Sequence, residues 1–63
     1  MLNYIRSHKY QECISYYTED IDYRECGEYI APGVGDRTGE EYDIFFKECG
    51  SGYCFDRVTR HNE

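Results

Sequence analysis

The segment "EYDIFFKECGSGYCFDRVT", residues 41–59, constrains the fold most strongly. β-Branched and aromatic residues lie on both sides of a Gly-Ser-Gly tip, which is typical of an antiparallel β-hairpin. A two-residue turn at Ser51-Gly52 would place Cys49 directly opposite Cys54. The same register would create three favourable cross-strand pairs, Lys47–Asp56, Phe45–Val58 and Asp43–Arg60. The opposite face would then be apolar, with Tyr42, Ile44, Phe46 and Phe55.

The N-terminal half is compatible with two structures. In "ECISYYTEDIDYREC", a turn at Glu19-Asp20 would pair Cys13 with Cys26 in a second hairpin, although Glu-Asp is poor chemistry for a tight turn. Alternatively, residues 2–17 form an amphipathic helix, because one stripe of side chains approximates helical spacing: Leu2, Ile5, Lys9, Cys13 and Tyr17. Both structures remain open at this point.

The segment "APGVGDRTG", residues 31–39, holds the only proline and three of the six glycines, so it predicts a loop between two halves. We expect residues 1–63 to form a single small domain. Its predicted class is small and β-rich (all-β or α+β), with a C-terminal antiparallel hairpin at about residues 41–59. A chain of this length buries only about 60% of its unfolded surface, so disulfides, a metal or a partner would contribute substantially to its stability.

The four cysteines have three interpretations. Disulfides 13–26 and 49–54 would each pin one hairpin and stabilise it by about 2–3 kcal/mol, provided that the compartment is oxidising. The cysteines could instead be free thiols packed as small apolar residues. The third interpretation is a zinc site formed by the four cysteines, or with His8 or His61 in place of one thiolate, but the spacing C-x12-C-x22-C-x4-C lacks the two close pairs typical of structural zinc.

Localisation depends on the same residues. The start "MLNYIRSHKYQEC" has no continuous apolar segment of the kind found in signal peptides, which favours the cytoplasm of a cell or host if Met1 is the native start. Oxidised cysteines would instead indicate a secreted protein.

Charge and composition argue against several classes of protein. Thirteen acidic and seven basic residues give a net charge of −6, which opposes direct binding to nucleic-acid phosphates. No window approaches the roughly 18 apolar residues of a membrane-spanning helix. Adjacent acids such as Glu19-Asp20 and Glu40-Glu41 are expected in an acidic chain, and "GVGDRTGE" lacks the Gly-Lys-Ser/Thr of a phosphate loop. We therefore expect neither catalysis nor a cofactor.

Acidic and tyrosine side chains coincide in residues 16–29 and 40–53. Tyrosine is enriched at interfaces, and carboxylates steer association with basic grooves. The leading hypothesis is a stoichiometric inhibitor of a partner protein with a basic surface, in its sharpest form a virus-encoded nucleic-acid mimic that acts against host defence or transcription. The expected contact residues are Tyr16, Tyr17, Glu19, Asp20, Asp22, Tyr23, Glu40, Glu41, Tyr42 and Asp43. The alternatives are a secreted, disulfide-stapled inhibitor or toxin-like module and a small zinc-binding adaptor.

Overall fold

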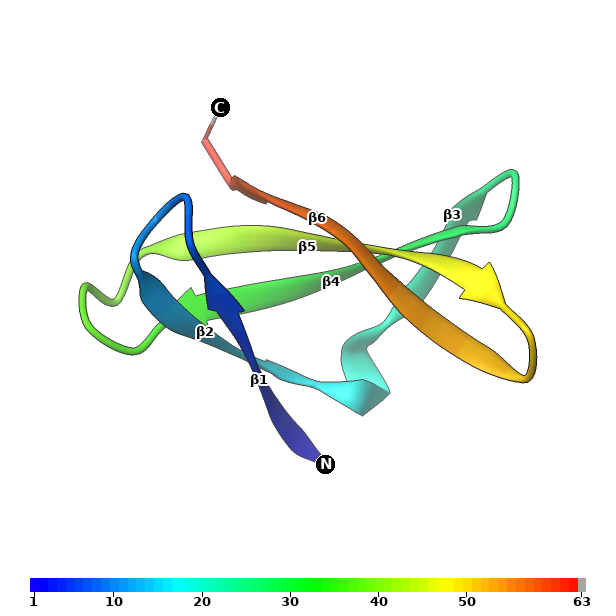
Figure 1. Cartoon of the computed structure of the whole chain (residues 1–63), viewed down its shortest axis with the longest axis horizontal. Helices are drawn as coiled ribbons and strands as arrows, with labels where there is room; N and C mark the ends of the chain where they lie inside the picture. The colour runs from blue at the N-terminus through cyan, green and yellow to red at the C-terminus, as the bar shows by residue number, and fades with distance from the viewer. Residues whose placement is uncertain (63) are drawn as a thin grey trace.

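The computed structural model describes residues 1–62, which form one antiparallel β-sheet (Figure 1). Its strands are β1 (Leu2–Ser7), β2 (Glu12–Tyr17), β3 (Asp22–Glu25), β4 (Glu28–Gly35), β5 (Glu41–Cys49) and β6 (Gly52–Arg60). The strand order is β1-β2-β4-β5-β6, and the short β3 also pairs with β4. The expected small β-rich class is confirmed, and within residues 1–62 it is all-β apart from one 3-10 turn, η1 (Thr18–Asp20).

The N-terminal half contains a hairpin that differs from both expectations. β1 pairs with β2 from Leu2↔Tyr17 to Ser7↔Glu12, and residues 8–11 form the turn. Exposure in β1 alternates residue by residue, which is the period of a strand and rules out the helix at 2–17. The hairpin centred on Glu19-Asp20 is also wrong, because β2 and β3 both pair with β4 instead of with each other. Cys13 consequently lies opposite Arg6 and not opposite Cys26.

The C-terminal hairpin is confirmed as β5–β6, but its register differs from the expected one. Cys49 pairs with Gly52, so the turn residues are Gly50 and Ser51, and Gly50 has a φ of 55° that glycine adopts without strain. The three expected cross-strand pairs are therefore not formed: Lys47 faces Cys54, Phe45 faces Arg57 and Asp43 faces Thr59. A bulge between the Phe45↔Arg57 and Phe46↔Phe55 pairs leaves Asp56 as the extra residue.

The loop expected at residues 31–39 is largely a strand. β4 continues through Gly35, and only residues 36–40 turn back to β5. Pro32 is tolerated because the ladder with β3 ends at Ile30 and the ladder with β2 begins at Val34, so one edge of β4 is unpaired between them. Gly33 allows β4 to pack closely against two core isoleucines, because a Cβ atom at this position would lie 2.7 Å from Ile14 Cγ2 and 2.8 Å from Ile44 Cδ1.

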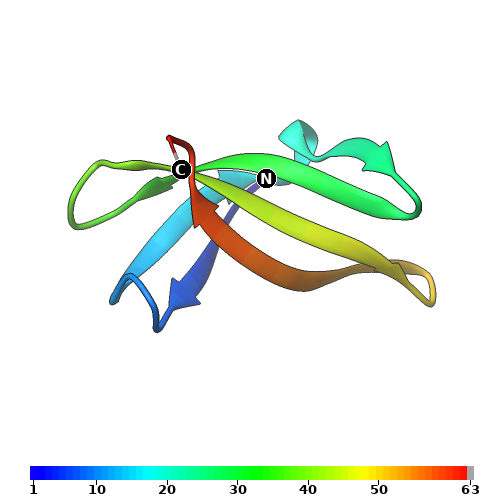
Figure 2. The same ribbon diagram turned by 90° about the horizontal axis from the view of Figure 1, so that it is seen from above.

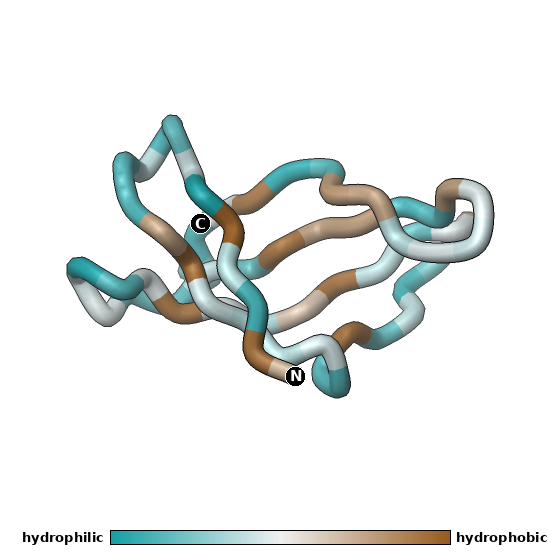
Figure 3. Tube along the Cα trace, turned by 60° about the horizontal axis from the view of Figure 1, so that its bottom comes forward, coloured by the Kyte–Doolittle hydropathy of each residue, from teal (hydrophilic) through white to brown (hydrophobic). Residues whose placement is uncertain are grey.

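The sheet is curled, with the β1–β2 and β5–β6 hairpins bending to the same side of β4 (Figure 2). Apolar positions of neighbouring strands lie side by side across the sheet (Figure 3). The core lies on the inner face of the curl and consists of Ile14, Ala31, Tyr42, Ile44 and Phe46, which are all at most 4% exposed. Partly buried residues extend it: Ile5, Tyr10, Tyr16, Ile21, Tyr29 and Val58.

The outer face carries one buried ring, Phe45, which is 8% exposed. The guanidinium of Arg57 lies 4.2 Å from its ring centroid and that of Arg24 lies 5.4 Å from it. Glu28 pairs with both arginines, at 2.7 Å from Arg24 and 3.4 Å from Arg57. The ring is thus covered by charged groups that neutralise one another. No helix within residues 1–62 is long and apolar enough to cross a membrane.

Candidate functional site

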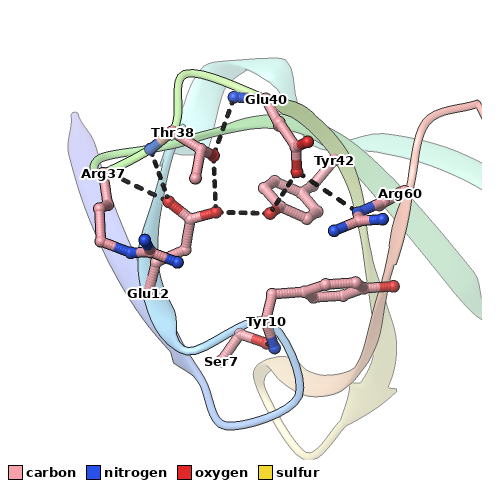
Figure 4. A network of polar contacts seen from close by, with 8 residues as sticks. All are labelled: Ser7, Tyr10, Glu12, Arg37, Thr38, Glu40, Tyr42 and Arg60. Atoms are coloured by element: carbon pink, nitrogen blue, oxygen red, sulfur yellow. Dashed lines mark hydrogen bonds and ion pairs between the residues drawn. The ribbon is translucent and has the colours of Figure 1, made fainter.

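A buried carboxylate, Glu12, organises one end of the inner face (Figure 4). Its Oε1 accepts hydrogen bonds from the backbone N–H groups of Arg37 at 3.0 Å and Thr38 at 3.1 Å. Its Oε2 accepts from the Thr38 hydroxyl at 2.9 Å and from the Tyr42 hydroxyl at 2.5 Å. Gly35 makes room for this carboxylate, since a Cβ atom there would overlap it.

The electrostatics of this network point to a structural role. The hydrogen bond from Tyr42, together with those from Thr38 and Arg37 and against the cost of burial, lowers the pKa of Glu12 to about 2. Burial, with the bond to Glu12, raises the pKa of Tyr42 to about 12. Both groups therefore keep their protonation state across the physiological range. The network ties the 36–39 turn to β2 and β5 and provides no acid or base poised near neutrality.

The other end of the inner face is open and aromatic. The Tyr29 ring lies 5.4 Å from Tyr23 and 4.6 Å from Tyr53, with edge-to-face geometry in both pairs. Tyr23 is 62% exposed and Tyr53 is 51% exposed. Beside these rings is a shallow hollow of about 330 Å³, which we call the tyrosine hollow; it is lined by Tyr29, Glu48, Gly50, Ser51, Gly52 and Tyr53.

Strand register builds the tyrosine hollow. Tyr23 lies directly opposite Tyr29 in the β3–β4 ladder, and Glu48 lies opposite Tyr53 in the β5–β6 ladder. The Glu48 N–H donates to the Gly27 carbonyl at 2.9 Å, and the Glu48 side chain leans over Gly27, where a Cβ would be 3.7 Å from its Oε2. Partial burial, followed by the nearby Glu48 carboxylate, raises the pKa of Tyr29, so its hydroxyl stays protonated at neutral pH.

The residues expected from the sequence to contact a partner fall into two separate groups. Those of the first group lie around η1 and β3: Tyr16, Tyr17, Glu19, Asp20, Asp22 and Tyr23. Those of the second group lie at the start of β5, at the opposite end of the sheet: Glu40, Glu41, Tyr42 and Asp43. Figures 1 and 2 both show these segments well apart. The structure therefore does not bring the ten residues together on one continuous surface.

Exposure differs within the first group. Tyr17 is 52% exposed, and the two acids of η1 and Asp22 are also exposed. Glu19 pairs with the N-terminal amino group of Met1. Tyr16 is half-buried, with its ring 5.3 Å from that of Phe46, so it presents only part of its surface to a partner.

The second group is mostly occupied within the chain. Tyr42 is 1% exposed, so its ring belongs to the core and cannot contact a partner in this structure. Glu40 pairs with Arg60 at 3.3 Å, and Asp43 lies 3.2 Å from the His61 ring nitrogen Nδ1. Glu41 is exposed at the first position of β5.

The cysteines divide into one bonded pair and two separate thiols. Cys49 and Cys54 form a disulfide across the β5–β6 tip, with Cα atoms 5.8 Å apart. The expected Cys13–Cys26 bond is not formed, because Cys13 lies within β2 and Cys26 in the β3–β4 turn. The tetrahedral cysteine site is likewise not assembled, and no group of three or more potential metal ligands occurs in residues 1–62.

Sequence reasoning missed Tyr29, Glu48 and Tyr53 as site residues. Their signal was available: Tyr29 shares its face of β4 with Ala31, and Tyr53 precedes Phe55 by two positions on one face of β6. Tyr29 was missed because residues 28–35 were not recognised as a strand, and Glu48 and Tyr53 were missed because the ring beside them comes from that strand.

Positive side chains gather elsewhere. A hollow of about 280 Å³ between the β1–β2 turn and β6 is lined by Arg6, Ser7, His8, Lys9, Phe55, Arg57 and Val58. This basic corner lies at the β1–β2 turn, away from η1 (Figure 1). No protein-family model matches the chain, and neither the curated proteins nor the solved structures contain a significant match.

Proposed function

We propose that this chain is a non-enzymatic binding protein that inhibits a partner stoichiometrically by covering a basic surface. The observation that carries the proposal is a group of exposed acidic and aromatic residues at the end of β2, in η1 and in β3. It includes the carboxylates of Asp20 and Asp22 and the rings of Tyr17 and Tyr23, which are 52% and 62% exposed. Such carboxylates accelerate encounter with a basic groove, and tyrosine rings supply rigid contact area.

In its sharpest form the proposal is nucleic-acid mimicry. Spaced carboxylates on a small rigid sheet would occupy the channel in which a partner holds phosphates, and the basic corner at Arg6 and Lys9 would face away from the interface. A virus-encoded inhibitor of host defence or transcription would fit this description. The net charge of −6 supports recognition of a basic protein over direct binding to nucleic acid.

The test is displacement of a labelled oligonucleotide from a panel of nucleic-acid-binding proteins, read by fluorescence anisotropy at low and high salt. We expect displacement at low salt that weakens as salt rises, because exposed charges are screened. Neutralising Asp20 and Asp22 together (D20N/D22N) should weaken it. The control pair R6Q/K9Q should leave it unchanged or improved. Electrostatic mimicry would be refuted if the extent of displacement changed neither with salt concentration nor in the D20N/D22N variant.

The Cys49–Cys54 bond favours a second candidate, a secreted and disulfide-stapled inhibitor or toxin-like module. Intact mass after thiol alkylation of the natively prepared, denatured protein distinguishes the candidates. A secreted module with this structure should show two reactive thiols, Cys13 and Cys26, and four after reduction. Four reactive thiols before reduction would favour the reduced, intracellular binder.

A further inference from the structure

Three of the chain's own arginines are held by an aromatic ring together with a carboxylate. Arg24 and Arg57 lie 5.4 Å and 4.2 Å from the Phe45 ring centroid, and both pair with the Glu28 carboxylate, at 2.7 Å and 3.4 Å. Arg60 lies 5.2 Å from the Tyr10 ring centroid and 3.3 Å from the Glu40 carboxylate. In each case the guanidinium is attracted by the negative face of the ring and by the formal charge beside it.

The tyrosine hollow offers the same two elements without a cation. Tyr29 and Tyr53 supply the rings, and Glu48 supplies the carboxylate. Within residues 1–62, none of the ion pairs includes Glu48. In the same part of the chain, the cation–ring contacts use only Phe45 and Tyr10. The hollow is therefore complementary in charge to a cation from outside.

The hollow is preorganised. Glu48 is positioned by its backbone bond to Gly27 and by the absence of a side chain there. The turn residues Gly50 and Ser51 are closed by the Cys49–Cys54 bond, which limits motion of the rim beside Tyr53. Because the backbone of these residues is already fixed, a bound side chain would cost little further backbone entropy in the hollow itself.

We propose that the tyrosine hollow receives an arginine side chain of the protein partner and is the anchor point of the interface. The guanidinium would lie against the Tyr29 and Tyr53 rings and pair with Glu48. The hollow is shallow and has a volume of about 330 Å³, which is enough room for the end of a side chain presented from a partner surface. This inference rests on the proposed function and names the contact through which a basic partner would be held.

The test is an NMR titration of the full ¹⁵N-labelled chain with a capped glycine peptide that carries one central arginine. A peptide with citrulline at that position is the matched probe, since citrulline has the same shape without the charge. We expect the arginine peptide to shift the amide signals of residues 50–53 and Gly27, and the citrulline peptide to leave them unchanged. Shifts that spread evenly over the acidic residues of η1 would overturn the assignment of the site.

Two variants and two controls define the site. Glu48→Gln and Tyr53→Leu should each weaken peptide binding roughly 2- to 5-fold, as expected for an exposed ion pair or cation–ring contact. Asp36→Asn removes the same charge as Glu48→Gln, from −6 to −5, but lies in the turn between β4 and β5. Tyr4→Leu removes a ring that is 58% exposed on β1. The controls should bind like the wild type, and equal losses in Asp36→Asn and Glu48→Gln would show that net charge alone is responsible.

The outcomes separate this inference from the proposed function. Oligonucleotide displacement that is unaffected by Glu48→Gln and Tyr53→Leu would leave the binding function standing and refute the anchor. Arginine-specific binding in the hollow without displacement from any partner would support the anchor and count against mimicry. If tetramethylammonium binds as tightly as the peptide, the ligand is a small organic cation and the arginine assignment is wrong.

Discussion

Gly33→Ala tests the packing of the curled sheet. The added methyl group would lie 2.7 Å from Ile14 Cγ2 and 2.8 Å from Ile44 Cδ1, both well inside van der Waals contact. Ile14 and Ile44 are each 0% exposed, so neither can swing into solvent to relieve the overlap. Overpacking of this kind costs about 1–3 kcal/mol. Replacing glycine within a strand recovers about 0.5–1 kcal/mol, because the unfolded chain loses freedom.

The net expectation is a decrease of about 1–2 kcal/mol in the free energy of unfolding, with a melting temperature lower by roughly 4–16 °C. Urea unfolding followed by circular dichroism measures the first quantity and a thermal scan the second. Gly52→Ala is the matched control: nothing lies within 4 Å of its Cβ position, so its stability should change by no more than about 0.5 kcal/mol.

A second substitution makes the mechanism specific. Ile44→Val removes the Cδ1 atom that the new methyl group meets, and alone it should cost about 0.5–1.5 kcal/mol. In the double variant the two costs should not add, because one of the two overlaps has gone. Additive costs, or a Gly33→Ala variant as stable as the wild type, would refute this account of why β4 carries glycine at this position.

Three further predictions concern charge, the disulfide and the outer face. The pKa of Glu12 is lowered to about 2 in the folded state. The stabilisation that Glu12 provides should therefore be complete above about pH 4.5 and be lost as the pH falls towards 2. In the Glu12→Gln variant, this part of the pH dependence of stability, measured by urea unfolding, should be absent. The Cys49–Cys54 bond closes a loop with a sequence separation of 5, so its reduction should lower the free energy of unfolding by about 2 kcal/mol, and a Cys49→Ser/Cys54→Ser variant should then be insensitive to reductant. Arg57→Gln should cost about 0.5–1 kcal/mol by removing the cation above Phe45 and its pairs with Glu28 and Asp56, and high salt should reduce this difference between variant and wild type in urea unfolding, because the Arg57 side chain is 48% exposed.

The C-terminal hairpin could be predicted because its strands are rich in aromatic and β-branched residues and its tip contains glycine. Its register could not, since moving the turn from Ser51-Gly52 to Gly50-Ser51 preserves which side chains share a face at the tip. Only the positive φ of Gly50 distinguishes the two turns, and backbone angles cannot be read from residue types alone.

Most of β4 was predicted to be a loop because its glycines and its proline are explained by contacts with other strands, which the local sequence does not reveal. Gly33 and Gly35 leave space for an isoleucine pair and a carboxylate that come from other strands, and Pro32 lies where no ladder bond is needed. Local sequence rules interpret such residues as turn formers. The candidate site could not be predicted for the same reason, because Tyr29 is recognised as part of an aromatic cluster only when residues 28–35 are known to be a strand.

The bulge at Asp56 has a consequence for changes in chain length. Before it, Tyr53 and Phe55 point to the inner face; after it, Val58 and Arg60 do so, whereas Arg57 points outward over Phe45. Deleting this one residue would remove the bulge and leave Phe55 opposite Phe46 and Arg57 opposite Phe45, so Val58 would still point inward and Arg57 outward. The bulge is therefore the position in β6 at which the loss of one residue leaves the inward and outward sides of the strand unchanged.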